Sequence, residues 1–279
     1  MPKREKVGKR YVALYIILRL LVTAVMVLEI FRKNYYNVFT CALTLVLFMI
    51  PTIVDRRFNI KLPTALESVI LLFIFAAEIL GEIQGFYVVF KHWDTMLHTI
   101  NGFLMAAIGF AMIDILNQHP RFHISMSPAF VAFVAFCFSM TIGVLWEFFE
   151  YSMDTLTRTD MQKDAVYQTV SSVELNPAGK NIPVVVSGIE ETVIRGKING
   201  QPQEVVIENG YLDIGLQDTM EDLLVNLIGA VVFSTIGALY IQGRGKGKIA
   251  RSFIPQLKTK AEIEETKKAA DKKEKSDEH

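Results

Sequence analysis

Cysteine is scarce in this chain, so no disulfide framework is expected. The 279 residues include two cysteines, Cys41 and Cys137, and both fall inside apolar stretches. We interpret them as small packing residues. The sequence also lacks a phosphate-binding loop, a nucleotide fingerprint and a nucleophile motif, which excludes the commoner classes of enzyme.

An excess of charge of either sign is missing too. Lysine plus arginine number 29, as do aspartate plus glutamate, so the formal net charge is zero. The charges gather in the termini and loops, and the basic residues flank long apolar runs, where they set membrane topology. No nucleic-acid partner is therefore expected. A chain that is 51% hydrophobic, with apolar runs that recur at this length, is typical of a multi-pass protein in a lipid bilayer.

The sequence predicts an all-α polytopic membrane protein with six transmembrane helices. The six apolar runs occupy residues 11–31, 36–54, 68–90, 95–116, 128–149 and 223–241. The first run follows a basic segment, but it is too long for a signal peptide and has no small-residue cleavage site, so we expect it to be retained. The predicted domains are helices one to five in 1–153, an insertion in 154–215, helix six in 216–243 and a charged tail in 244–279.

The insertion at 154–215 differs in residue composition from the rest of the chain. Its β-rich runs are residues 184–186, 192–198 and 204–207. Asn199-Gly200 and Asn209-Gly210 are strong turn signals. They predict a small β-hairpin cap, although a flexible spacer is the alternative.

The distribution of basic residues predicts the orientation in the cell (cytoplasmic) membrane. Most lysine and arginine lies in the amino-terminal segment, in the loop at 55–63 and in the tail after Gln242. Because cytoplasmic segments are enriched in these residues, both termini are predicted to be cytoplasmic. The insertion and the start of the fourth helix would then be extracytoplasmic.

Polar side chains recur where the last three predicted helices reach this outer surface. Asp94 and His98 are four residues apart, so they share one face of a helix. In the fifth helix the shared face carries Glu147, Glu150 and Asp154. In the sixth helix it carries Asp218, Asp222 and Asn226. A polar helix end that only reaches toward the lipid headgroups is the simpler alternative for the first pair.

One imidazole and several carboxylates from three helices suit a divalent cation, whose identity the sequence leaves unknown. The predicted metal ligands are Asp94, His98, Glu147, Asp218 and Asp222. Glu150 is the predicted general base and His98 a second catalytic residue, while Asp154 and Asn226 complete the pocket. The alternative is a water-bridged polar network that joins the helices. The third helix adds Glu78 and Glu82, one turn apart inside an apolar run, where ionisable residues usually mark a pathway or a site.

These motifs resemble those of a known family. Asp94-x-x-x-His98-x-x-x-Gly102, Trp146-Glu147-x-x-Glu150 and Asp218-x-x-x-Asp222 with Gly229-Ala230 resemble the YjdF-like bacterial membrane proteins of the wider VanZ-like group. The resemblance covers the last three spans, and the insertion at 154–215 is longer than the family leads one to expect. It implies an outer-facing polar site and names no substrate.

Three functional hypotheses follow from the sequence. The first is a membrane-embedded, metal-dependent hydrolase or transferase that acts on a lipid-linked or envelope substrate. The second is an ion or small-solute transporter that uses Glu78 and Glu82 as a relay. The third is a non-catalytic envelope protein in which the polar cluster only fastens the helices. The sequence does not indicate an oligomeric state.

Overall fold

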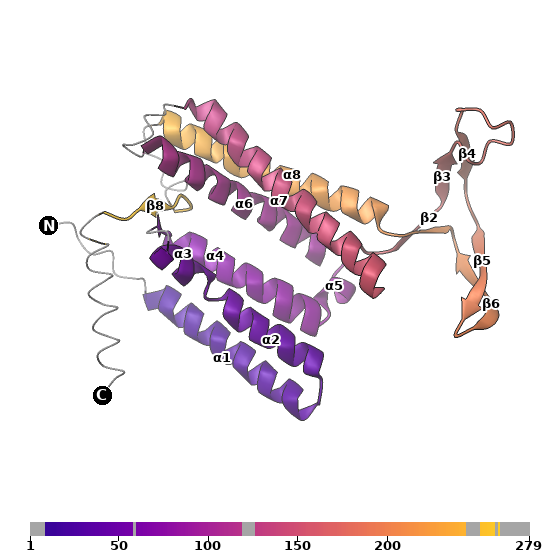
Figure 1. The fold of residues 1–279 in the computed structure, drawn as a ribbon, viewed down its shortest axis with the longest axis horizontal. Coiled ribbons are helices and arrows are strands. Elements are labelled where there is room, and N and C mark those ends of the chain that lie inside the picture. The colour runs from indigo at the N-terminus through magenta and orange to yellow at the C-terminus, as the bar shows by residue number, and fades with distance from the viewer. Residues whose placement is uncertain (1–8, 58–59, 119–125, 244–251, 260–261, 263–279) are drawn as a thin grey trace. The chain divides into compact units, whose positions relative to one another are not determined.

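The protein is mostly helical (Figure 1). The computed structural model describes residues 9–57, 60–118, 126–243, 252–259 and 262. Within these ranges, six helical stretches are long and apolar enough to cross a membrane. The prediction of a helical membrane protein with six spans is confirmed at this level.

The first half of the chain differs from the predicted spans in two places. Its helices are α1 (Lys9–Phe31), α2 (Tyr35–Leu47), α3 (Ile50–Arg57), α4 (Thr64–Phe75), the π-helix η1 (Ala76–Ile83) and the short α5 (Phe86–Val89). The second span is interrupted between α2 and α3. The third span continues from α4 into η1 and ends at Ile83, before residue 90, because Gly85 takes a left-handed conformation with φ 71°.

The last three long helices carry most of the predicted site residues. They are α6 (Trp93–Gln118), α7 (Pro128–Thr157) and α8 (Leu216–Gln242). α7 continues beyond residue 149, and α8 begins before residue 223, because polar residues extend both helices. At the start of α8, the Asp213 carboxylate accepts a hydrogen bond of 2.9 Å from the Gln217 N–H. Asp218 also places a negative charge in the first turn, where the helix dipole favours it.

The chain packs as two compact units. The first contains the described residues of Met1–Gly143 and Val225–His279, and it has two separate hydrophobic clusters. One cluster is built from α1, α2, α4 and η1. The other is built from α6, the first turns of α7, the second part of α8 and Ile254. The members of this second cluster are Ala106, Ala107, Phe110, Val131, Ala135, Ala230, Phe233 and Ile254.

The second unit, Val144–Leu224, contains the predicted β-rich insertion. Its strands are β2 (Ala165–Tyr167), β3 (Thr169–Ser172), β4 (Val184–Ser187), β5 (Glu191–Ile198), β6 (Gln201–Glu208) and β7 (Tyr211–Asp213). They form antiparallel pairs, β2 with β7, β3 with β4 and β5 with β6. The predicted runs correspond to β4, β5 and β6, and Asn199-Gly200 makes the turn of the β5–β6 hairpin, both residues with positive φ. The sequence did not predict β2, β3 and β7.

The chain after α8 was predicted only as a charged tail, yet part of it is ordered against the helices. β8 (Gln256–Leu257) pairs antiparallel with β1 (Ile60–Lys61), which precedes α4. Most of the predicted tail, including residues 263–279, lies outside the described residues.

Candidate metal centre

Helices α6 and α8 approach each other closely at two glycines. A Cβ added at Gly102 on α6 would overlap the backbone carbonyl oxygen of Asn226 on α8. A Cβ added at Gly229 on α8 would overlap the carbonyl oxygen of Thr99 on α6. Small residues allow this approach between helices in a membrane. The backbones of α6 and α8 are therefore in contact over the turns between Thr99 and Gly102.

Asn226 joins three helices at this level. Its side chain is fully buried, and its Oδ1 accepts a hydrogen bond of 3.1 Å from Asn101 Nδ2 on α6. Its Nδ2 lies 3.6 Å from the Met140 sulfur on α7, and a Cβ at Gly143 on α7 would stand 2.8 Å from the same nitrogen. This amide, which the sequence placed in the pocket, packs into the contact between α6, α7 and α8.

One helical turn away from Asn226, each helix carries an ionisable side chain. Asp222 precedes Asn226 by four residues on α8, and Glu147 follows Gly143 by four residues on α7. His98 precedes Gly102 by four residues on α6. Each helix runs without a break through these positions, so a spacing of four places each ionisable side chain on the same helical face as its partner near Asn226.

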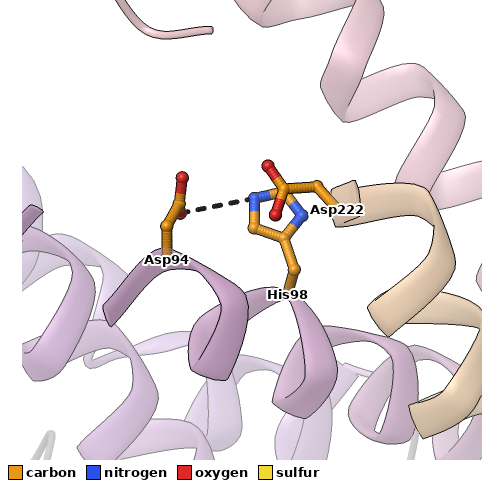
Figure 2. A group of neighbouring side chains, drawn as sticks. All are labelled: Asp94, His98 and Asp222. Atoms are coloured by element: carbon orange, nitrogen blue, oxygen red, sulfur yellow. Dashed lines mark ion pairs between the residues drawn. The ribbon is translucent and has the colours of Figure 1, made fainter. Parts of the chain in front are cut away.

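Five of the predicted site residues form two overlapping groups that share His98. Ligand atoms of Asp94, His98 and Asp222 lie within 4.8 Å of one another, and so do those of His98, Glu147 and Glu150. Figure 2 shows the first group, with the Asp222 carboxylate beside the imidazole ring. A dashed line there marks the contact of 3.5 Å between His98 Nε2 and Asp94 Oδ1. The structure thus has a cluster of histidine, aspartate and glutamate that could hold a metal ion.

Burial makes the charge of this cluster important. His98, Glu147, Glu150 and Asp222 are each no more than 6% exposed. Carboxylates at this separation repel one another, and burial weakens the screening of that repulsion. The arrangement is favourable when a cation, a shared proton or a charged imidazole lies among the carboxylates. A divalent cation would compensate the most charge.

Trp146 is a functional candidate that sequence reasoning did not assign a role. Its Nε1–H donates a hydrogen bond of 2.9 Å to Glu150 Oε1, one turn along α7. A donor held in this position orients the carboxylate. The spacing Trp146-x-x-x-Glu150 was visible in the sequence, but nothing in the sequence showed that the indole would turn toward Glu150.

Two predicted residues serve the adjoining loop in the structure. Asp218 lies outside both groups, and its Oδ2 accepts a hydrogen bond of 2.8 Å from the Lys163 N–H. Asp154, at the end of α7, accepts bonds from Thr159 Oγ1 and from the backbone N–H groups of Met161 and Gln162. Both carboxylates therefore hold the segment after α7. The spacing of these residues could not show that loop amides would bind their carboxylates.

The same loop carries an acidic group with a shifted pKa. Burial raises the pKa of the Asp164 carboxyl, and repulsion by the carboxylates of Asp160, Asp154 and Asp213 raises it further. The Asp164 N–H also lies 3.4 Å from Asp160 Oδ1. These acids belong to the second unit and stand outside the two His98 groups.

Glu78 and Glu82 lie on a different helix from the residues grouped around His98. Both belong to η1, where the helix widens to the π form inside the third span. Neither belongs to the groups around His98. The structure therefore separates the predicted relay residues from the predicted metal ligands.

Comparison with known proteins places the chain in a family. The six apolar helices identify the class as a polytopic membrane protein. Residues 14–243 match the family described as predicted membrane protein (DUF2238), and the chain belongs to that family. The match does not extend to the YjdF-like or VanZ-like names. No curated protein and no solved structure matches this chain.

Proposed function

We propose that this protein is a metal-dependent membrane enzyme, a hydrolase or transferase that acts on a lipid-linked or envelope substrate. The observation that carries the proposal is the position of His98, which belongs to both ligand groups. One imidazole nitrogen with carboxylate oxygens is a donor set that suits hard or borderline divalent cations. The overlap of the two groups at a buried histidine favours a single centre.

The residues of the centre divide into ligands and a base. Asp94, His98, Glu147 and Asp222 are the proposed ligands, and Asp218 supports them by anchoring the loop at Lys163. A divalent cation there would supply Lewis-acid chemistry toward a carbonyl or phosphoryl oxygen. Glu150 is the proposed general base, because Trp146 fixes the orientation of its carboxylate. His98 would keep the ligand geometry and assist proton transfer.

Metal content of the purified protein tests this proposal. Elemental analysis should find a divalent metal in the unchanged protein, and His98→Ala should lower its content at least about tenfold. The matched control is His92→Ala, since His92 is exposed and lies outside both groups. Equal metal content in the two variants would contradict the proposal and favour a polar network without metal.

The proposal also places the centre at the outer surface of the cytoplasmic membrane. The support is the excess of lysine and arginine in the termini and in the loop at 55–63. A reporter fused after Gln242 should lie in the cytoplasm, and one inserted within 176–210 should lie outside. If both reporters lie on the same side, the outer placement is wrong.

The second candidate function is transport, and the observation that favours it is the π-helix. Glu78 and Glu82 lie within η1, and π-helical segments often occur at functional sites. For a transporter, Glu78→Gln should abolish solute flux in proteoliposomes and leave the metal content unchanged. Normal flux in that variant would exclude a relay through Glu78.

A further inference from the structure

Part of the described segment 252–259, which follows α8 in the chain, is buried among the helices. Ile254 is 1% exposed and belongs to the cluster formed by α6, α7 and α8. Phe253 packs beside it, with its ring edge-on to Phe103 of α6 and the two ring centroids 5.2 Å apart. Pro255 is also buried and has no N–H that would need a partner there. Irregular backbone is tolerated at such positions only where protein covers it.

The following residues bind a different part of the fold. Gln256 and Leu257 pair through their backbones with Lys61 and Ile60, in the strand before α4. Lys258 Nζ then forms an ion pair of 2.7 Å with Asp55 Oδ2 on α3. The Lys258 side chain is 7% exposed, so little water competes with this ion pair.

The segment thus joins two groups of helices that have separate hydrophobic clusters. Ile254 belongs to the cluster of α6, α7 and α8, whereas α3 and β1 connect the helices of the other cluster. α4 and η1 also contact α6 directly. The segment's printed links to the second group are a two-residue ladder and the Lys258–Asp55 ion pair, and Glu262, which is bonded to Thr259, adds an ion pair of 3.5 Å with Lys61. Such elements open locally at a lower free energy than packed helices do.

We propose that residues 252–259 form a latch, which fastens α6 and α8 to the segment between α3 and α4 and opens without unfolding the helices. The Lys258–Asp55 ion pair holds the latch closed. Ile254 is the residue that leaves the interior when the latch opens. Opening would free the α3–β1 end of the first helix group from α6.

Cysteine labelling of the full-length protein in detergent tests the latch. The background carries Cys41→Ala and Cys137→Ala, and a single cysteine replaces either Ile254 or the exposed Ser252. The cysteine at 254 should react with a maleimide at least about tenfold more slowly than the one at 252. Adding Lys258→Gln should speed labelling at 254 by about tenfold or more and leave the rate at 252 unchanged.

A charge exchange supplies the matched control. The double variant Asp55→Lys with Lys258→Asp restores an opposite pair and should return labelling at 254 to the slow rate. Equal rates at 254 and 252 in the parent background would overturn the proposal, because Ile254 would not be held inside. If Lys258→Gln leaves the labelling rate at 254 unchanged, the ion pair does not hold the latch closed.

Hydrogen exchange tests the latch without a cysteine at 254, so it also applies where that substitution disturbs folding. In an otherwise unchanged protein, Lys258→Gln should increase amide exchange in a peptide that covers 252–259 and leave α6 protected. Faster exchange throughout α6 would show that the segment does not open as an independent unit, and it would contradict the latch.

Discussion

Helices α1 and α6 are both long and apolar, yet they are used differently. The protein buries 11% of the residues in the most apolar stretch of α1 and 50% of those in the most apolar stretch of α6. α1 exposes large side chains such as Ile17, Leu20 and Leu28. α6 buries small ones, among them Ala106 and Ala107, and places Gly102 against α8. A span made of large side chains faces lipid, whereas a span with small residues packs against other helices.

The difference explains where the ionisable residues are. His98 is buried because α6 is covered by its neighbours, so a polar side chain on it can meet polar side chains from α7 and α8. The buried acid of α1 is Glu29, close to the end of the helix. It is satisfied locally by Arg32 at 2.9 Å and by Asn37 at 3.0 Å. α6 therefore contributes to the cluster around His98, whereas Glu29 of α1 stabilises the turn that follows this helix.

The strongest test of this contrast is enlargement of a contact residue in α6. Gly102→Leu should lower the free energy of unfolding by about 3 kcal/mol or more, because the side chain has no space beside Asn226. Leu20→Ala, on the exposed face of α1, should change it by less than about 0.5 kcal/mol. Thermal unfolding in detergent measures both. A similar loss in the two variants would remove the distinction between the helices.

Removal of the amide between α6 and α8 should have the next largest effect. Asn226→Ala deletes the acceptor of Asn101 Nδ2 in a buried position, which should cost about 1–3 kcal/mol. It should also weaken metal binding, because the turn that carries Asp222 loses its support. If the variant keeps its full stability and its full metal content, Asn226 does not support the turn that carries Asp222.

The corresponding change in α1 should cost less. Glu29→Gln weakens the contacts with Arg32 and Asn37, and we expect a loss of about 1 kcal/mol, because the Arg32 side chain is 72% exposed and water can solvate it. The bound metal should be unchanged. A stability loss larger than that of Asn226→Ala would reverse the contrast between the two helices.

The smallest effect is expected outside the spans, in the acidic loop. Because the folded-state pKa of Asp164 is raised, stability falls as pH rises from its ordinary value of 3.8 through the folded-state value. Asp164→Asn should therefore stabilise the protein at pH 7 by less than about 0.5 kcal/mol, the scale of exposed charges. The benefit should vanish below pH 3.8. Equal stabilisation at both pH values would mean that charge repulsion is not its cause.

Much of this arrangement follows from the sequence alone. Apolar length predicted the spans, and a spacing of four placed Asp94 with His98 and Asp222 with Asn226 on shared helical faces. The interruption of the second span and the π-helix were not predictable, because they depend on how neighbouring helices pack. Asp218 was predicted as a metal ligand and Asp154 as part of the pocket. In the structure their carboxylates accept hydrogen bonds from loop amides, whose positions spacing cannot give. Phe253 and Ile254 were missed, since two apolar residues in a charged tail form no periodic signal.

X-ray absorption spectroscopy of the protein loaded with a divalent metal tests directly whether His98 binds the metal. We expect one imidazole nitrogen and several carboxylate oxygens at about 2.0–2.2 Å from the metal, as for zinc. In His98→Ala the imidazole contribution should disappear, whereas His92→Ala should leave the spectrum unchanged. A spectrum without imidazole in the unchanged protein, or one that His98→Ala does not alter, would contradict the centre proposed around His98.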